Sequence, residues 1–241
     1  MNWRAINDQE LENHAMMLRQ QMQVPATEPI ILEKVIRERN IIACFQPINE
    51  QLSGMAIVVG KDDKVCRFML VNTNHQLCKQ RFTACHELYH LLFQKEFSST
   101  VEKEKLTETN DLEEIRANHF ASALLMPEMG LRMLTPIEQQ RKDAITMGTL
   151  MMLQYRFLCS HGALLYRLLR LGWISNGFLK QMIPDVRTHV REYGYNPGLY
   201  EPTKKTELWG DYNLIARRLL DGGVITREKY DEYLSAMDYG L

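Results

Sequence analysis

Two histidines and a glutamate stand close together at residues 86–90, which read His-Glu-Leu-Tyr-His. Residues four apart lie above one another on one face of a helix, so His86 and His90 can bind one metal ion through two imidazoles. Glu87 lies one step round the helix, near the open side of that ion. This H-E-x-x-H arrangement supplies two ligands and a general base. The alternative is a solvated helix face with two spare histidines.

A third ligand must come from another segment, because zinc in hydrolases usually has three protein ligands and one water. The stretch 111–126 contains three acids. Steps of three and four residues from Glu114 reach small or apolar residues and one asparagine, a stripe that suits packing against another helix. The same steps from Glu113 reach Arg116, which indicates a solvent-exposed face of the helix. Asp111 lies at the end of the helix. Glu114 is therefore the favoured ligand, with Glu113 as the second choice.

The asparagine of that stripe is Asn118. Metal-bound histidines usually donate their other ring N–H to an acceptor, so Asn118 could orient His86 or His90. A packing hydrogen bond that is unrelated to a metal explains Asn118 equally well. Tyr89 lies inside the motif, where its ring is expected to pack rather than to take part in catalysis.

The chemistry of this set is hydrolysis. A bound metal ion polarises a substrate carbonyl and makes water easier to deprotonate. Glu87 can take the proton and deliver it to a leaving amine. Two imidazoles and a carboxylate suit zinc, and the sequence leaves manganese and iron open as the working metal.

The segments that must position these residues change character along the chain. A helix is expected at 8–22 and a short one at Leu32–Arg37. Three runs rich in Ile, Val and Phe predict a small three-stranded antiparallel sheet at 41–48, 54–60 and 66–73. The two zinc helices follow at 75–95 and 111–126, the second with Asp111 as its N-cap. The polar stretch between them, 96–110, reads as a mobile surface loop, with a lid as the alternative.

Beyond Pro136 the pattern is helical throughout. Met147–Phe157 is one expected helix, and Ser160 can cap the next, which runs to Gly172. A turn-rich linker at 194–202 precedes two short helices. The predicted fold is thus α+β and mostly helical. A zinc peptidase domain at 1–134 is followed by a helical region at 135–241, which contains a helix-turn-helix-like segment at about 145–175.

The composition is that of a soluble globular protein, with 45% hydrophobic and 24% charged residues among 241. The net charge of −1 gives no general attraction to nucleic acid or anionic membranes. The start of the chain lacks a secretory pattern, and no run of about 18 apolar residues predicts a membrane span. Five cysteines without a C-x-x-C pair indicate a reducing compartment, which is the cytoplasm.

The two zinc helices resemble the ImmA/IrrE family of metallo-endopeptidases. RFTACHELYHLLF and EEIRANHFASALLMP match the family's R-x-x-x-A-H-E-x-x-H and E-x-x-A-N-x-F-A-x-x-L-L-M-P patterns, and weaker similarity extends over roughly 35–240. The resemblance implies zinc ligands His86, His90 and Glu114 and the base Glu87. It also implies a protein substrate, a helix-turn-helix repressor or antitoxin encoded nearby. The chain departs from the pattern at Tyr89, usually Gly, and Cys85, usually Ala, which leaves the shape of the substrate groove open.

A different class of function is a DNA-binding or partner-binding regulator with a structural zinc site. Residues 151–191 contain six Lys or Arg against the single acid Asp185, as a phosphate-contacting surface would. The expected recognition helix, however, is mostly leucine, which suits packing better than contacts to bases. Direct binding to nucleic acid is therefore not expected, and the helical half is open to a role in docking the substrate.

Overall fold

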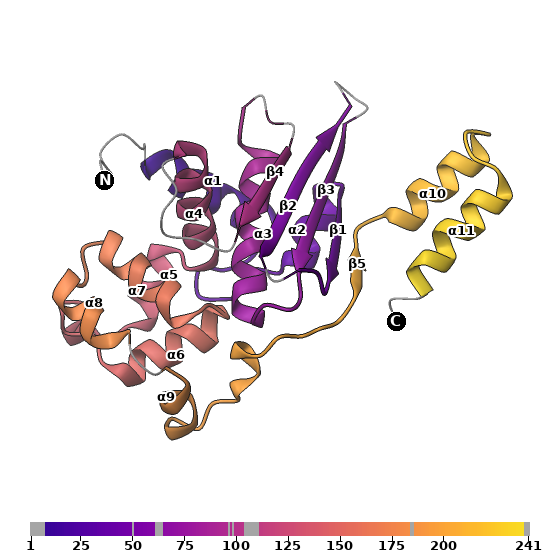
Figure 1. Ribbon diagram of the computed structural model, residues 1–241. Coiled ribbons are helices and arrows are strands. Elements are labelled where there is room, and N and C mark those ends of the chain that lie inside the picture. Colours follow the sequence, from indigo (N-terminus) through magenta and orange to yellow (C-terminus); the bar gives the residue numbers. More distant parts are fainter. Residues whose placement is uncertain are drawn as a thin grey trace.

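The computed structural model describes residues 8–49, 51–60, 65–95, 97, 99–103, 111–183 and 186–238. One sheet lies in the middle of the molecule, with α1, α3 and α4 on one side of it (Figure 1). The elements are α1 (Asp8–Gln21), α2 (Leu32–Glu38), β1 (Ile41–Gln46), β2 (Leu52–Val59), β3 (Cys66–Asn72), α3 (Leu77–Leu92), β4 (Ser99–Lys103), α4 (Leu112–Leu125), α5 (Glu128–Leu134), η3 (Ile137–Gln139), α6 (Met147–Phe157), α7 (His161–Arg170), α8 (Asn176–Met182), α9 (Val186–Glu192), η4 (Pro197–Tyr200), β5 (Glu207–Trp209), α10 (Tyr212–Asp221) and α11 (Arg227–Asp238).

The α+β class and the high helix content are confirmed, but the predicted three-stranded antiparallel sheet is wrong. The sheet has five strands in the order β4-β2-β3-β1-β5. β2 pairs antiparallel with β3, whereas β1 pairs with β3 in parallel. Both edges are completed by strands that the sequence pattern did not predict, β4 beside β2 and β5 beside β1.

The polar stretch at 96–110 is not a loop throughout, because β4 forms within it. An edge strand gains its ladder hydrogen bonds from one neighbour and does not need the apolar alternation of a core strand. Residues 96, 98 and 104–110 of that prediction lie outside the described residues.

Small residues bring α3 close to the sheet. Ala43, Ala56 and Gly54 share the face that also carries Met69 and Val71, as the strand registers show. A Cβ built on Gly54 would lie 2.4 Å from Cγ2 of Thr83 on α3, so the helix lies against the backbone of β2. This close contact fixes the height of α3 above the strands.

α4 packs against both α3 and α1, and two buried arginines bind the carbonyls at its end. Arg19 of α1 donates to the carbonyl of Leu124 at 2.7 Å, and Arg167 of α7 donates to that of Met126 at 3.1 Å. These cations meet the C-terminal carbonyls of α4, where a helix carries partial negative charge. The N-terminus of α4 is capped by Asp111, as predicted.

The C-terminal half contains the helices expected from the sequence. α6 has the predicted bounds, and Ser160 accepts a hydrogen bond from the backbone N–H of Ala163 at the start of α7. One cluster of buried side chains includes residues from both sides of position 134. The division into two domains there stays a prediction, as does the helix-turn-helix character of α6 and α7.

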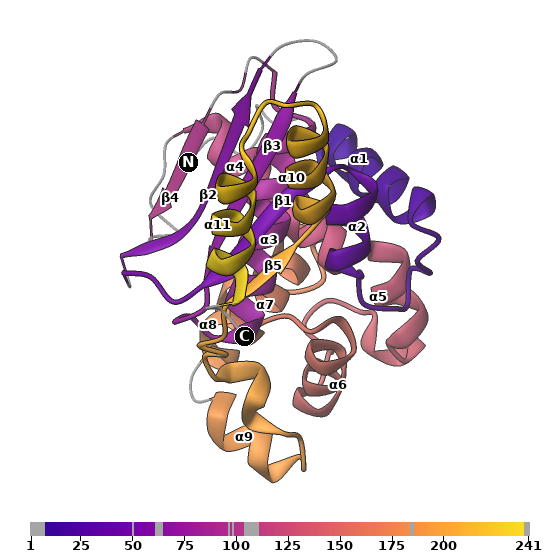
Figure 2. The same ribbon diagram turned by 90° about the vertical axis from the view of Figure 1, so that its right-hand side faces the viewer.

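The last part of the chain returns to the sheet. After η4, β5 joins β1, and α10 and α11 then form a hairpin on the far side of the sheet from α1 and α4 (Figure 1). Figure 2 shows the two helices of this hairpin side by side. Within the described residues, no helix has the length and hydropathy needed to cross a membrane.

Candidate metal centre

α3 places both histidines of the motif on its buried face. His86 and His90 are each 1% exposed, one helical turn apart. Their Nε2 atoms face each other at 3.0 Å. Two imidazole nitrogens at this distance need a proton or a cation between them, because their lone pairs would otherwise repel.

Glu114 of α4 completes the group. Its Oε2 lies 3.1 Å from Nε2 of His86, and its Oε1 lies 3.5 Å from Nε2 of His90. All ligand atoms of the three residues lie within 4.8 Å of one another. No other set of three or more His, Cys, Asp or Glu residues converges in this way within the described ranges. The Glu114 side chain is 25% exposed, so the cluster opens to solvent on the α4 side.

Glu113, the second choice for the third ligand, has different neighbours. Its Oε2 accepts a hydrogen bond from the Tyr89 hydroxyl at 2.7 Å. Its Oε1 lies 3.7 Å from the Arg116 guanidinium. The structure therefore brings Glu114, and not Glu113, to the two histidines.

An amide oxygen holds the outer ring nitrogen of each histidine. Oδ1 of Asn118 lies 3.0 Å from Nδ1 of His86, and Oε1 of Gln94 accepts from Nδ1 of His90. An amide oxygen can only accept, so each Nδ1 carries the proton and each Nε2 presents a lone pair to the centre. Asn118 thus contacts His86, one of the two histidines that the sequence indicated as its possible partners. The same role was not predicted for Gln94, although Gln94 lies four residues after His90.

The electrostatics favour the protonation states of metal ligands. Burial, reinforced by the charge of His86, lowers the pKa of His90 and so favours its neutral ring. A hydrogen bond from a protonated His86 ring is the main cause of the lowered pKa of Glu114, so the carboxylate is ionised before a metal ion takes the place of that proton. Neutral imidazole and ionised carboxylate are the forms that bind metal ions.

Glu87 is fully buried on α3 beneath β2. A Cβ built on Gly54 would lie 3.0 Å from Oε1 of Glu87, so the strand backbone lies directly against the carboxylate. Sequence reasoning missed Gly54, although a glycine inside a strand often marks a close approach.

Two aromatic rings border the cluster. Tyr89 lies edge-on to the His90 ring and packs near Phe120 of α4. Its hydroxyl donates a hydrogen bond to Glu113. Tyr89 therefore supports the contact between the two helices. Phe97 stacks on the His90 ring, with centroids 5.5 Å apart, so the chain after α3 folds back over the site.

A comparison with protein families finds the IrrE N-terminal-like domain over residues 48–169, about half of the chain. The match covers β2 to α7 and includes the two histidines, Glu87 and Glu114. The chain belongs to the ImmA/IrrE family of metallopeptidases. No curated protein matches the chain. The family match and the convergent His, His and Glu group agree in indicating a metal-binding metallopeptidase.

Proposed function

We propose that this ImmA/IrrE family protein is a zinc-dependent endopeptidase that cleaves a regulatory protein in the cytoplasm. The observation that carries the proposal is the convergence of His86, His90 and Glu114 on one point, with Nε2 to Oε2 and Nε2 to Nε2 distances of 3.1 and 3.0 Å. These residues would hold the ion. The donor set fits zinc, which several hydrolases bind through two imidazoles and a carboxylate.

Residues around the metal site would carry out the proton transfer and orient the ligands. When bound, zinc polarises a carbonyl and eases the deprotonation of water. Glu87 takes the proton of the attacking water and passes it to the leaving amine. Asn118 and Gln94 keep the two imidazoles in the tautomer that exposes Nε2. The burial of His86, Glu87 and His90 keeps bulk water away from the carboxylate that moves the proton.

The substrate proposed is a helix-turn-helix repressor or an antitoxin encoded nearby, in line with the family resemblance. Residues 1–134 form the peptidase domain in this proposal, and 135–241 form a helical region with its helix-turn-helix-like segment at α6 and α7. A DNA-binding role would require exposed, unpaired Lys and Arg side chains in residues 151–191, and two of the six are paired with acids. Arg167 is buried against Glu12, and Arg156 pairs with Glu28. A docking role for this region is therefore favoured over direct contact with DNA.

The test uses the full chain, stripped of metal and reloaded with zinc, manganese or iron in parallel. Each sample is incubated with the purified repressor from the neighbouring gene, and mass spectrometry identifies the products. We expect one cleavage site with zinc, none with His86→Ala, and normal cleavage with the control His189→Ala. An intact repressor with all three metals would contradict the substrate assignment, and cleavage by His86→Ala would contradict the metal centre.

A further inference from the structure

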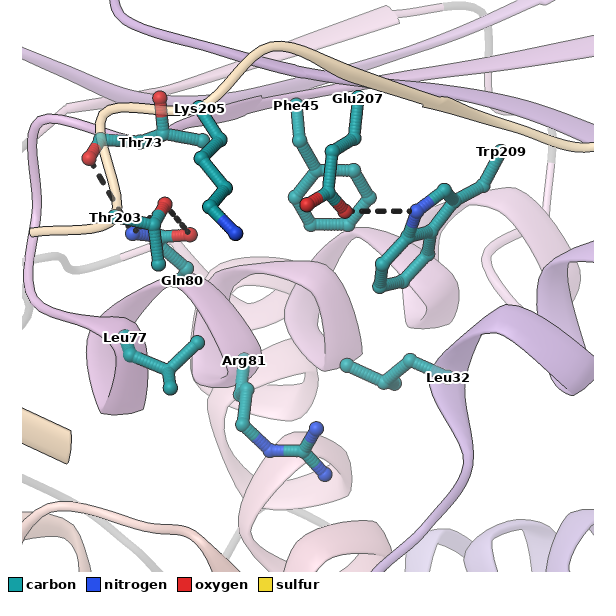
Figure 3. Close-up of a pocket in the computed structure, with 10 residues that line it drawn as sticks. All are labelled: Leu32, Phe45, Thr73, Leu77, Gln80, Arg81, Thr203, Lys205, Glu207 and Trp209. Carbon is teal, nitrogen blue, oxygen red and sulfur yellow. Dashed lines mark hydrogen bonds between the residues drawn. The ribbon is translucent and has the colours of Figure 1, made fainter. Parts of the chain in front are cut away.

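A pocket lies at the other end of α3, away from the metal centre. Residues 201–209, here called the strap, run from η4 into β5 and cross the start of α3. The backbone N–H of Leu77 donates to the carbonyl of Glu201 at 3.0 Å, and that of Lys204 donates to the carbonyl of Thr73 at 3.0 Å. Gln80 on α3 and Thr203 on the strap bind each other at 3.1 Å. The pocket lies between this strap, β1 and the helices α2 and α3 (Figure 3).

The walls of the pocket are apolar and partly flat. Phe45 and Trp209 stand together with ring centroids 4.3 Å apart, and Leu32 and Leu77 lie opposite (Figure 3). The cavity measures about 100 Å³ and is partly open to solvent. An apolar lining with a few polar groups is typical of sites that hold small organic molecules. A flat ring offers the best contact with two aromatic side chains.

Two cationic residues line this space, and one of them, Arg81, donates to the carbonyl of Ile30 at 2.9 Å. The amine of Lys205 points into the pocket (Figure 3), and in the part of the chain that the structure describes it makes no hydrogen bond or ion pair. Of the other polar groups in the lining, the buried Thr73 hydroxyl has no hydrogen-bond partner within the described residues, whereas Glu207 and Gln80 have partners. Glu207 accepts from the indole N–H of Trp209 at 3.1 Å, and Gln80 binds Thr203. Lys205 is thus the cation left to bind an anion.

We propose that this pocket binds a small monocarboxylate with a flat apolar body. The carboxylate meets the amine of Lys205, and the body lies against Phe45, Trp209 and Leu77. Because Lys205 and Trp209 belong to the strap and Leu77 to α3, the ligand joins the strap to the helix that carries His86 and His90. The site is separate from the metal centre, and the inference does not depend on the proposed peptidase function.

The test follows the ¹⁹F NMR signals of protein labelled with 5-fluorotryptophan. Trp3, Trp173 and Trp209 are the three tryptophans, and Trp209→Phe assigns the pocket signal. The probes are benzoate and indole-3-acetate, matched by the neutral benzyl alcohol and indole-3-ethanol. We expect a saturable shift of the Trp209 signal with the acids, and affinity about tenfold lower or worse for the alcohols, since a charge-assisted contact is lost.

Two variants distinguish binding in this pocket from binding elsewhere on the protein. Lys205→Ala should weaken binding of the acids by about tenfold or more. Lys180→Ala, which removes an exposed lysine of α8, should leave it unchanged. Carboxylates also bind zinc, so the titration is repeated with His86→Ala, where we expect the same affinity. The proposal is overturned if neither acid shifts the Trp209 signal, if Lys205→Ala binds as tightly as the native chain, or if His86→Ala abolishes binding.

Discussion

At the residue scale, the assignment of the third ligand depends on what two neighbouring carboxylates meet. Consecutive residues of a helix point about 100° apart, so Glu113 and Glu114 cannot both face α3 in the same way. Glu114 lies 3.1 Å from His86, while Glu113 accepts from the hydroxyl of Tyr89. The two residues have the same chemistry and differ only in direction, which makes them matched controls.

We expect Glu114→Gln to lower zinc affinity by at least about tenfold, because even groups that only orient a metal ligand contribute that much. Glu113→Gln should keep the native affinity, since its carboxylate contacts Tyr89 and Arg116 instead. Competition with a chromophoric chelator measures both variants. Equal zinc affinity in the two variants, or a larger loss with Glu113→Gln, would show that the third ligand is wrongly assigned.

At the element scale, the position of α3 beneath β2 depends on a residue without a side chain. Gly54 lets the strand backbone lie against Thr83 and Glu87, where an added Cβ would come within 2.4 and 3.0 Å of their atoms. Contacts this short require either the strand or the Thr83 and Glu87 side chains to move. The ligands on the same helix have no such contact with Gly54.

Gly54→Ala should therefore lower the rate of cleavage by about tenfold or more while zinc affinity stays native, because displacing a catalytic group by about 1 Å can cost this much. Overpacking should also lower the free energy of unfolding by about 1–3 kcal/mol. Gly162→Ala on α7 is the control, since its Cβ would meet nothing within 4 Å. Steady-state kinetics and denaturant titration check both variants. Native kinetics in Gly54→Ala would mean that the close approach has no catalytic importance.

At the scale of the whole molecule, a buried ionic group connects both halves of the chain. Glu12 of α1 lies 2.8 Å from the guanidinium of Arg167 on α7 and 3.1 Å from His119 on α4. Burial alone would raise the pKa of Glu12, but its hydrogen bonds with Arg167 and His119 outweigh burial and lower it to about 2. The pair stabilises the fold above the ordinary carboxyl pKa of 4.5 and loses this effect as the pH falls towards 2.

Glu12→Gln should lower the free energy of unfolding at pH 7 by about 3 kcal/mol, because Arg167 then stays buried without its partner. The difference from the native chain should shrink as the pH falls from 4.5 towards 2. Urea titrations over that pH range measure it. The surface pair of Glu28 and Arg156 gives the control, where Glu28→Gln should cost less than about 1 kcal/mol. A pH-independent difference would contradict the depressed pKa of Glu12.

The parts that sequence reasoning predicted are those with a local signal. Helical periodicity and capping residues predicted α3, α4, α6 and α7. The spacing of His86 and His90, and the helix face of Glu114, predicted the three ligands of the metal centre. The parts that it missed depend on distant contacts. The parallel pairing of β1 with β3 follows from packing of the whole sheet, and β5 is three residues long and joins β1 from far along the chain. Gln94 lies four residues after His90 and within the helix predicted over 75–95, so helical spacing could have indicated it.

The central claim is that Glu87 moves the proton in a reaction supported by a metal ion that His86, His90 and Glu114 hold. The direct measurement is zinc content and repressor cleavage by Glu87→Gln, compared with the native chain. This substitution keeps the shape of the side chain and removes its basicity. The account predicts one zinc ion per chain in both proteins and loss of cleavage in Glu87→Gln alone. Cleavage at the native rate by Glu87→Gln would contradict it.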